Sequence, residues 1–125
     1  SERLERGGYL RMKELLAAPC RPTAVFVAYD QMAIGASLAL QEAGCSVPGE
    51  LSIVSFDNIN ASEFVFGGLT TVATPMDDTV SVAVRLLLDR IDGQEGRAVQ
   101  HVTIQPSLVV RHSTAAIEPA RPAAH

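Results

Sequence analysis

Two apolar runs in the sequence each end in a pair of polar residues that could contact a ligand. Residues 24–28 stop at Tyr29 and Asp30, and residues 51–56 stop at Asp57 and Asn58. The stretch between the runs has the apolar spacing of a helix, so the segment is predicted to fold as strand, helix and strand. Because ligands bind at the carboxyl ends of parallel strands, we expect the binding site at these two polar pairs.

Asp57 is the strongest candidate for ligand contact. A carboxylate at the end of a buried strand can accept hydrogen bonds from two neighbouring sugar hydroxyls, and each bond to a charged group is worth about 1.5 to 3 kcal/mol. A second interpretation is that Asp57 caps the loop that follows it, at Asn60 or Ala61. The residue type and its position leave both interpretations open.

Tyr29 and Asp30 offer different chemistry. The ring of Tyr29 could stack on a sugar or base and offer its hydroxyl, or it could simply pack and fill the pocket, and both interpretations stay open. Asp30 directly precedes the helix predicted for residues 31–43. We therefore expect Asp30 to be a structural N-cap worth about 1 kcal/mol rather than a ligand contact.

Sequence motifs of enzymatic sites are absent. The chain has no G-x-S-x-G elbow, no P-loop and no G-x-G-x-x-G, and His101, His112 and His125 are too scattered to form a metal site or a catalytic triad. The pair Gly67-Gly68 is not followed by a helix whose N–H groups could hold a phosphate. We predict no enzymatic activity, no metal and no cofactor.

The composition indicates one globular domain. Of 125 residues 47% are hydrophobic and 19% are charged, and no run of about 18 uncharged apolar residues predicts a membrane span. The net charge of −4 leaves no basic stripe to neutralise DNA phosphates. Cys20 and Cys45 form no disulfide framework, which favours a reducing, cytoplasmic location.

Alternating helices and strands must position the candidate residues. The order predicts an α/β three-layer sandwich with a mainly parallel sheet. An Ala- and Pro-rich tail, residues 115–125, is expected to be disordered. We predict helices at 2–18, 31–43 and 77–92, a helical turn at 61–64, and strands at 23–28, 51–56, 69–73, 101–105 and 108–112.

Four motifs carry a resemblance to a known family. They are PTAVFVAYDQMAIGASLALQEAG, VPGELSIVSFDN, LTTV and SLVVRHST. In this order and spacing they resemble the LacI/GalR family of bacterial transcription regulators. The resemblance implies a periplasmic binding protein-like I fold, with residues 1–114 as the C-terminal lobe of an effector-binding domain. We expect the DNA-binding headpiece and most of the N-terminal lobe to be absent from this sequence.

The resemblance also assigns roles to the candidates. The aspartate that matches Asp57 contacts sugars in sugar-responsive members, so ligand binding becomes the favoured interpretation. Tyr29 stands where the family usually has an asparagine or aspartate that faces the effector. Thr74 stands where a polar contact is common, and Met76 where an apolar wall is usual. The resemblance implies that the chain crosses between lobes near residues 74–76.

Besides Tyr29, three further positions depart from the family pattern. Ser55 replaces a common glycine, Gly67 replaces a proline, and Val80 replaces a glycine within a helix. Two aromatic residues near the site, Phe64 and Phe66, could each wall the pocket, but aromatic residues in an apolar domain more often belong to the core, which is the interpretation we favour.

The resemblance implies the ligand-sensing part of a transcription regulator. Such a domain binds a small effector, a sugar or related metabolite, forms dimers, and reaches DNA only through its headpiece. A periplasmic sugar-binding protein of a transport system is the alternative, and an oligomerisation module is a third interpretation. Because the helix at 77–92 would lose its usual partner, we expect the chain to form a homodimer, with this helix or adjoining strands exchanged.

Overall fold

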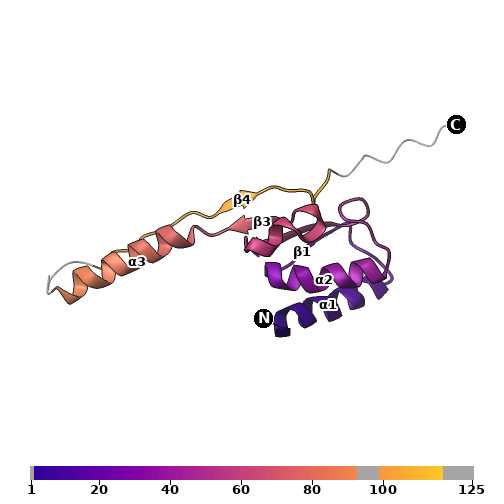
Figure 1. Ribbon diagram of the computed structural model, residues 1–125, viewed down its shortest axis with the longest axis horizontal. Helices are drawn as coiled ribbons and strands as arrows, with labels where there is room; N and C mark the ends of the chain where they lie inside the picture. Colours follow the sequence, from indigo (N-terminus) through magenta and orange to yellow (C-terminus); the bar gives the residue numbers. More distant parts are fainter. Residues whose placement is uncertain (1, 93–98, 117–125) are drawn as a thin grey trace.

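The computed structural model describes residues 2–92 and 99–116. Helices and strands alternate through most of this part of the chain, as the sequence predicts (Figure 1). The elements are α1 (Glu2–Ala17), β1 (Ala24–Phe26), α2 (Asp30–Glu42), β2 (Ser52–Asp57), the 3-10 helices η1 (Asn60–Glu63) and η2 (Val65–Gly67), β3 (Thr70–Ala73), α3 (Met76–Ile91) and β4 (Ser107–Val109).

The four strands form one mixed, mostly parallel sheet in the order β1-β2-β3-β4. β1 and β3 both run parallel to the central β2, and β4 joins β3 in the antiparallel direction. Helices flank the sheet, which confirms the predicted α/β class. Because β1, β2 and β3 are parallel neighbours, their carboxyl ends meet at one edge of the sheet.

Helices α1 and α2 pack against each other and supply most of the core. Two glycines allow their backbones to touch. A Cβ atom on Gly35 would lie 1.7 Å from the backbone oxygen of Glu5, and one on Gly8 would lie 1.9 Å from that of Met32. The buried apolar residues are Met12 and Leu16 of α1, Ala33, Ala36, Ala39 and Leu40 of α2, and Val27, Leu51, Ile53 and Leu69 of the strands and loops.

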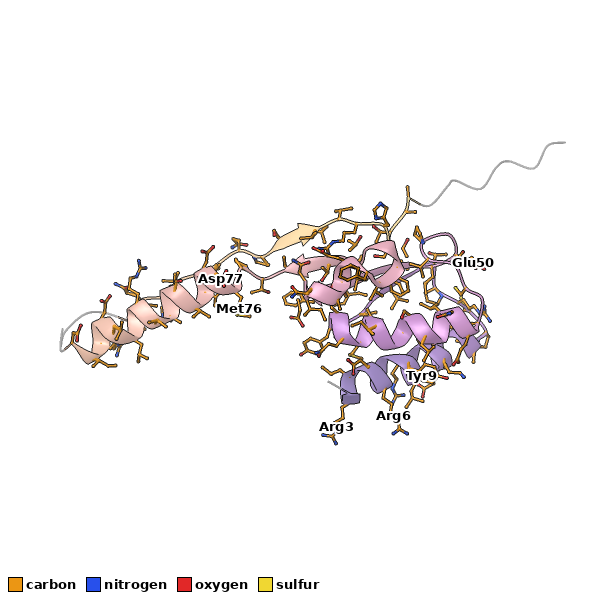
Figure 2. The ribbon with its side chains drawn as sticks, in the orientation of Figure 1. Arg3, Arg6, Tyr9, Glu50, Met76 and Asp77 are labelled. Atoms are coloured by element: carbon orange, nitrogen blue, oxygen red, sulfur yellow. The ribbon has the colours of Figure 1, made fainter. Side chains whose placement is uncertain are left out.

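Helix α3 projects away from the rest of the molecule (Figure 1). None of its residues is buried, and Leu87 and Ile91 are 59% and 67% exposed. Figure 2 shows Met76 and Asp77 at the end of α3 nearest the sheet. The helix is expected to lose its usual partner, and the described part of the chain provides no other cover for it.

Two predictions about the C-terminal segment need correction. Residues 101–105 do not form the predicted strand, and of residues 108–112 only the beginning belongs to β4. A strand needs a neighbour for its backbone N–H and C=O groups. Residues 107–109 find that neighbour in β3, whereas the ladder has no partners at 101–105. The predicted tail lies mostly outside the described residues, which end at 116.

Candidate functional site

Asp57 ends β2 with its side chain exposed at the sheet edge where the parallel strands stop. Its φ is +115°, and that of Asn58 is +55°, so two consecutive residues adopt left-handed backbone conformations. Such conformations are costly for residues with a side chain, at about 1 to 3 kcal/mol each, and they cluster at functional sites. The turn they make ends the strand sharply.

The carboxylate of Asp57 is available to a ligand. Within the described ranges it forms no hydrogen bond, and the amide of Ser62 in the following turn donates to Ile59 instead. The loop-capping interpretation is therefore not supported. Partial burial raises the pKa of Asp57, and the negative charge of the nearby Asp30 raises it further.

Asp30 does not cap helix α2, so that prediction is wrong. Tyr29 is the N-cap residue and makes no capping hydrogen bond with its side chain, while Asp30 is already the first helical residue. The Asp30 side chain is fully buried. It turns inward because hydroxyl groups from two strands and a 3-10 helix lie within hydrogen-bonding reach there.

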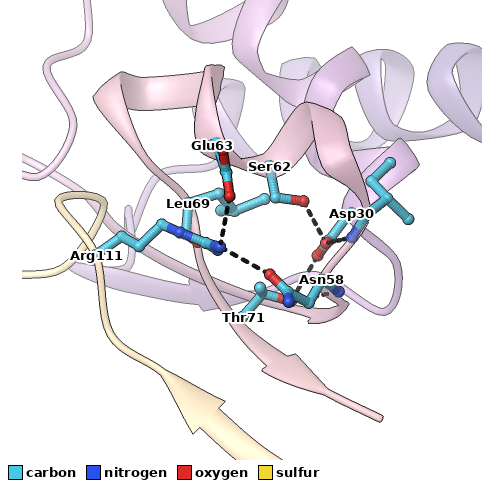
Figure 3. Close-up of polar contacts among 8 residues, drawn as sticks. Asp30, Asn58, Ser62, Glu63, Leu69, Thr71 and Arg111 are labelled. Carbon is cyan, nitrogen blue, oxygen red and sulfur yellow. Dashed lines mark hydrogen bonds and ion pairs between the residues drawn. The ribbon is translucent and has the colours of Figure 1, made fainter. Parts of the chain in front are cut away.

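The carboxylate of Asp30 accepts four hydrogen bonds. On Oδ1 the donors are the hydroxyls of Ser55 and Thr71, the latter at 2.7 Å. On Oδ2 they are the Ser62 hydroxyl and the Ile59 amide, the latter at 3.0 Å. Figure 3 shows Ser62 and Thr71 converging on the carboxylate. Hydrogen bonds to this one carboxylate therefore connect α2, β2, η1 and β3 beside the loop that follows Asp57.

Arg111 holds the same loop from the other side, a role that the residue-by-residue predictions missed. Its guanidinium donates to the side-chain oxygen of Asn58 at 2.8 Å and to the backbone oxygen of Leu69 at 2.9 Å, and lies 3.9 Å from the Glu63 carboxylate (Figure 3). The available signal was its place in the SLVVRHST motif. The loop is thus bonded to two distant segments of the chain.

The remaining predicted site residues lie at the same edge of the sheet. Tyr29 follows β1 and is 46% exposed, outside the core cluster, and half-buried Thr74 follows β3. Met76 is 61% exposed at the start of α3. Of the two nearby phenylalanines, Phe66 packs against the core as predicted, whereas Phe64 is 81% exposed, so its prediction is wrong.

Residues 2–92 and 99–116 contain neither a candidate metal centre nor a membrane-spanning helix. No cluster of three or more His, Cys, Asp or Glu side chains there could hold a metal ion. No helix in these ranges combines the length and apolar character of a membrane span.

Sequence comparison finds relatives among bacterial repressors. A family model described as a periplasmic binding protein-like domain matches residues 2–114. The chain is 45% identical to the HTH-type transcriptional repressor MelR of Bacillus subtilis, over 86% of this chain and 31% of that protein. It is 40% identical to a lactose operon repressor of Rhizobium radiobacter, over 85% of this chain and 92% of that sequence. The chain thus spans about a third of the MelR repressor.

Solved structures show the same likeness. One is a LacI family transcriptional regulator from Enterococcus faecium with bound ribose, which is 35% identical to this chain and has a TM-score of 0.81. The match covers 91% of this chain and 41% of the regulator's chain. Another is a Lac repressor dimer bound to operator and an anti-inducer, which is 32% identical to this chain and has a TM-score of 0.78. The match covers 89% of this chain and 38% of the repressor chain.

Proposed function

The chain belongs to the LacI/GalR family of transcription regulators, and from this premise we propose that it is the ligand-sensing part of such a regulator. In this proposal residues 1–114 form the C-terminal lobe of the effector-binding domain. The effector is a small molecule that binds at the carboxyl ends of the parallel strands. The protein is not an enzyme and acts in the cytoplasm.

The observation that carries the proposal is the exposed carboxylate of Asp57. It stands on a strained turn, forms no hydrogen bond within the described residues, and lies at the same sheet edge as Tyr29 and Thr74. A fold that only needed to close this loop would gain nothing from two left-handed residues there. A buried, internally bonded Asp57 would add weight to the oligomerisation-module interpretation, and the exposed carboxylate does not favour it.

We propose a polyhydroxylated effector, such as a sugar. An ionised carboxylate only accepts hydrogen bonds, so it suits hydroxyl donors, and an exposed tyrosine ring suits the apolar face of a sugar. The bound ribose in the Enterococcus faecium regulator belongs to that protein and supports the class of ligand. A transport protein is not favoured, because the relatives are named as repressors.

In the whole regulator, we propose that effector binding changes how far two lobes close on each other. The polypeptide would cross between the lobes at residues 74–76, directly beside the site. An effector that binds one closure state more tightly shifts the population toward that state. In a dimer, this shift would alter the spacing of the DNA-binding headpieces and hence the affinity for the operator.

We also propose that this chain self-associates through α3. The helix exposes an apolar face that includes Val80, Val84, Leu87 and Ile91. Each such side chain is worth about 1.5 to 3 kcal/mol when buried. A second copy could cover this face, with α3 or the adjoining strands exchanged between the two chains.

A calorimetric screen of pentoses, hexoses and disaccharides tests the proposed effector site. For a sugar that binds, Asp57→Asn should weaken affinity by at least about tenfold, because bonds to a charged acceptor are worth about 1.5 to 3 kcal/mol. Asp78→Asn is the matched control, since it removes the same charge from the exposed surface of α3. Equal affinities for both variants would refute the proposed site.

A further inference from the structure

Asp30 is an unusual residue to find at the centre of this lobe. Its side chain is completely buried, and within the described residues it forms no ion pair. Burying a charge without a cation is costly unless hydrogen bonds replace the lost water. Here four donors do so, and no buried side-chain polar atom in the described ranges lacks a partner.

Three of the four donors lie close to the candidate ligand residue in the sequence, one before it and two after it. Ser55 lies two residues before Asp57 and Ile59 two residues after it, while Ser62 lies in η1. The fourth donor is the Thr71 hydroxyl, whose oxygen also accepts a hydrogen bond of 3.3 Å from the backbone amide of Asn58. Asp30 therefore bonds to the chain on both sides of the left-handed turn.

Ser55 supplies this network with a donor that a glycine would lack. The resemblance implies that glycine is common at this position, and glycine has no hydroxyl to donate. The Ser55 side chain is fully buried, and its hydroxyl donates to the Asp30 carboxylate. β2 is thereby bonded directly to the start of α2, immediately before Asp57.

We propose that Asp30 is a positioning residue that fixes the Asp57 carboxylate for effector binding by clamping the chain before and after it. This inference rests on the proposed function. The left-handed φ values of Asp57 and Asn58 persist only where neighbouring structure enforces them. Without the clamp, the turn relaxes toward ordinary negative φ values and the carboxylate moves out of its binding position.

Amide hydrogen exchange measured by NMR tests the clamp without any ligand. Asp30→Asn keeps the side-chain size but replaces one acceptor oxygen with an NH2 donor. The amide of Ile59 should then exchange at least tenfold faster, while the amides of Ala39 and Leu40 in the helical core change less than twofold. Unchanged exchange at Ile59 overturns the proposal.

Milder variants cover the case in which Asp30→Asn fails to fold. Ser62→Ala and Ser55→Gly each remove one donor and should each accelerate exchange at Ile59. Ser37→Ala is the matched control, because the Ser37 hydroxyl has one partner among the described residues, the Ile34 backbone oxygen in α2. If the control variant loosens Ile59 as much as Ser62→Ala does, the clamp is overturned.

A double-mutant cycle separates positioning from general stability. For a sugar that binds, Asp30→Asn should weaken affinity, but the double variant with Asp57→Asn should bind no more weakly than Asp57→Asn alone. Additive losses would mean that Asp30 does not act through Asp57, and would overturn the proposal. If the wild-type chain binds no sugar while Asp30→Asn still loosens Ile59, the proposed function fails and the clamp of the loop stands.

Discussion

At the scale of single residues, the environment of Asp57 changes the pKa of its carboxyl group. Partial burial raises the pKa of Asp57, and the charge of Asp30 adds to the rise. The folded state then binds this proton more tightly than the unfolded chain does. The contribution of Asp57 to stability is therefore full at low pH, and it falls as pH rises between the ordinary pKa of 3.8 and the raised value.

The first prediction concerns this titration. Asp30→Asn should lower the pKa of Asp57, because the variant removes the negative charge that opposes ionisation. NMR observation of the Asp57 side-chain carboxyl carbon across a pH series measures the change. Asp78→Asn, on α3, should leave the titration where it was. An Asp57 that titrates at or below the ordinary value in the wild-type chain would contradict the account.

A second prediction concerns Arg111. Arg111→Met should lower the free energy of unfolding by about 1 to 3 kcal/mol, because it removes the hydrogen bonds to Asn58 and to the Leu69 backbone. Urea denaturation measures the change. Arg11→Met is the control, since Arg11 forms an exposed pair with Glu14 that is worth about 0 to 1 kcal/mol. Equal stabilities for the two variants would contradict the role assigned to Arg111.

Sequence reasoning predicted the sheet edge at which the candidate residues lie better than it predicted what each side chain contacts. Asp57 and Tyr29 are predicted from the ends of apolar runs, a signal that depends on neighbouring positions alone, whereas Thr74 is predicted from the family resemblance. The inward turn of Asp30 depends on Ser55, Ser62 and Thr71, which are distant in the sequence. Helix-start statistics favour a cap for an aspartate at this position, and tertiary hydrogen bonds override that preference.

At the scale of elements, the contact between α1 and α2 organises the core. Gly35 lies where the two backbones meet, whereas a Cβ atom added to Gly7 of α1 would meet no other atom within 4 Å. Gly35→Ala should therefore destabilise the chain by more than about 1 kcal/mol, since its methyl group would overlap the Glu5 backbone. Gly7→Ala should stabilise it by about 0.5 to 1 kcal/mol through helix propensity.

Thermal and urea unfolding of both glycine variants test this third prediction. Because both changes add one methyl group to a helical glycine, their opposite signs would isolate the effect of the helix contact. A Gly35→Ala chain as stable as the wild type would contradict the close approach of the two helices.

Elements were predictable where local pattern and tertiary surroundings agree. The periodic helices and the apolar strands of the parallel sheet were found within a few residues of their observed bounds. The run at 101–105 has strand-like composition, yet it remains irregular because the ladder provides no neighbour there. Composition expresses a preference for extended structure, and only a partner strand can stabilise it.

At the scale of the whole molecule, α3 exposes an apolar face that no other part of the described chain covers. A fourth prediction is that the chain forms a dimer in sedimentation velocity experiments over a concentration series. Leu87→Asp should raise the dissociation constant at least about tenfold, since burying one leucine is worth about 1.5 to 3 kcal/mol.

Ser81→Asp, an exposed position on the same helix, is the control and should leave association nearly unchanged. A compact wild-type monomer at all concentrations would contradict self-association through α3. Such a result would also question the crossover at residues 74–76, because the helix would then have to fold back on its own lobe.

The most direct test of the central claim is a two-dimensional NMR titration of the isotope-labelled chain with the sugar panel. Effector sensing at the sheet edge predicts that a binding sugar shifts the amide signals of Tyr29, Asp57 to Ile59 and Thr74, and that Asp57→Asn abolishes these shifts. Shifts confined to other surfaces, or no response to any sugar, would contradict the account.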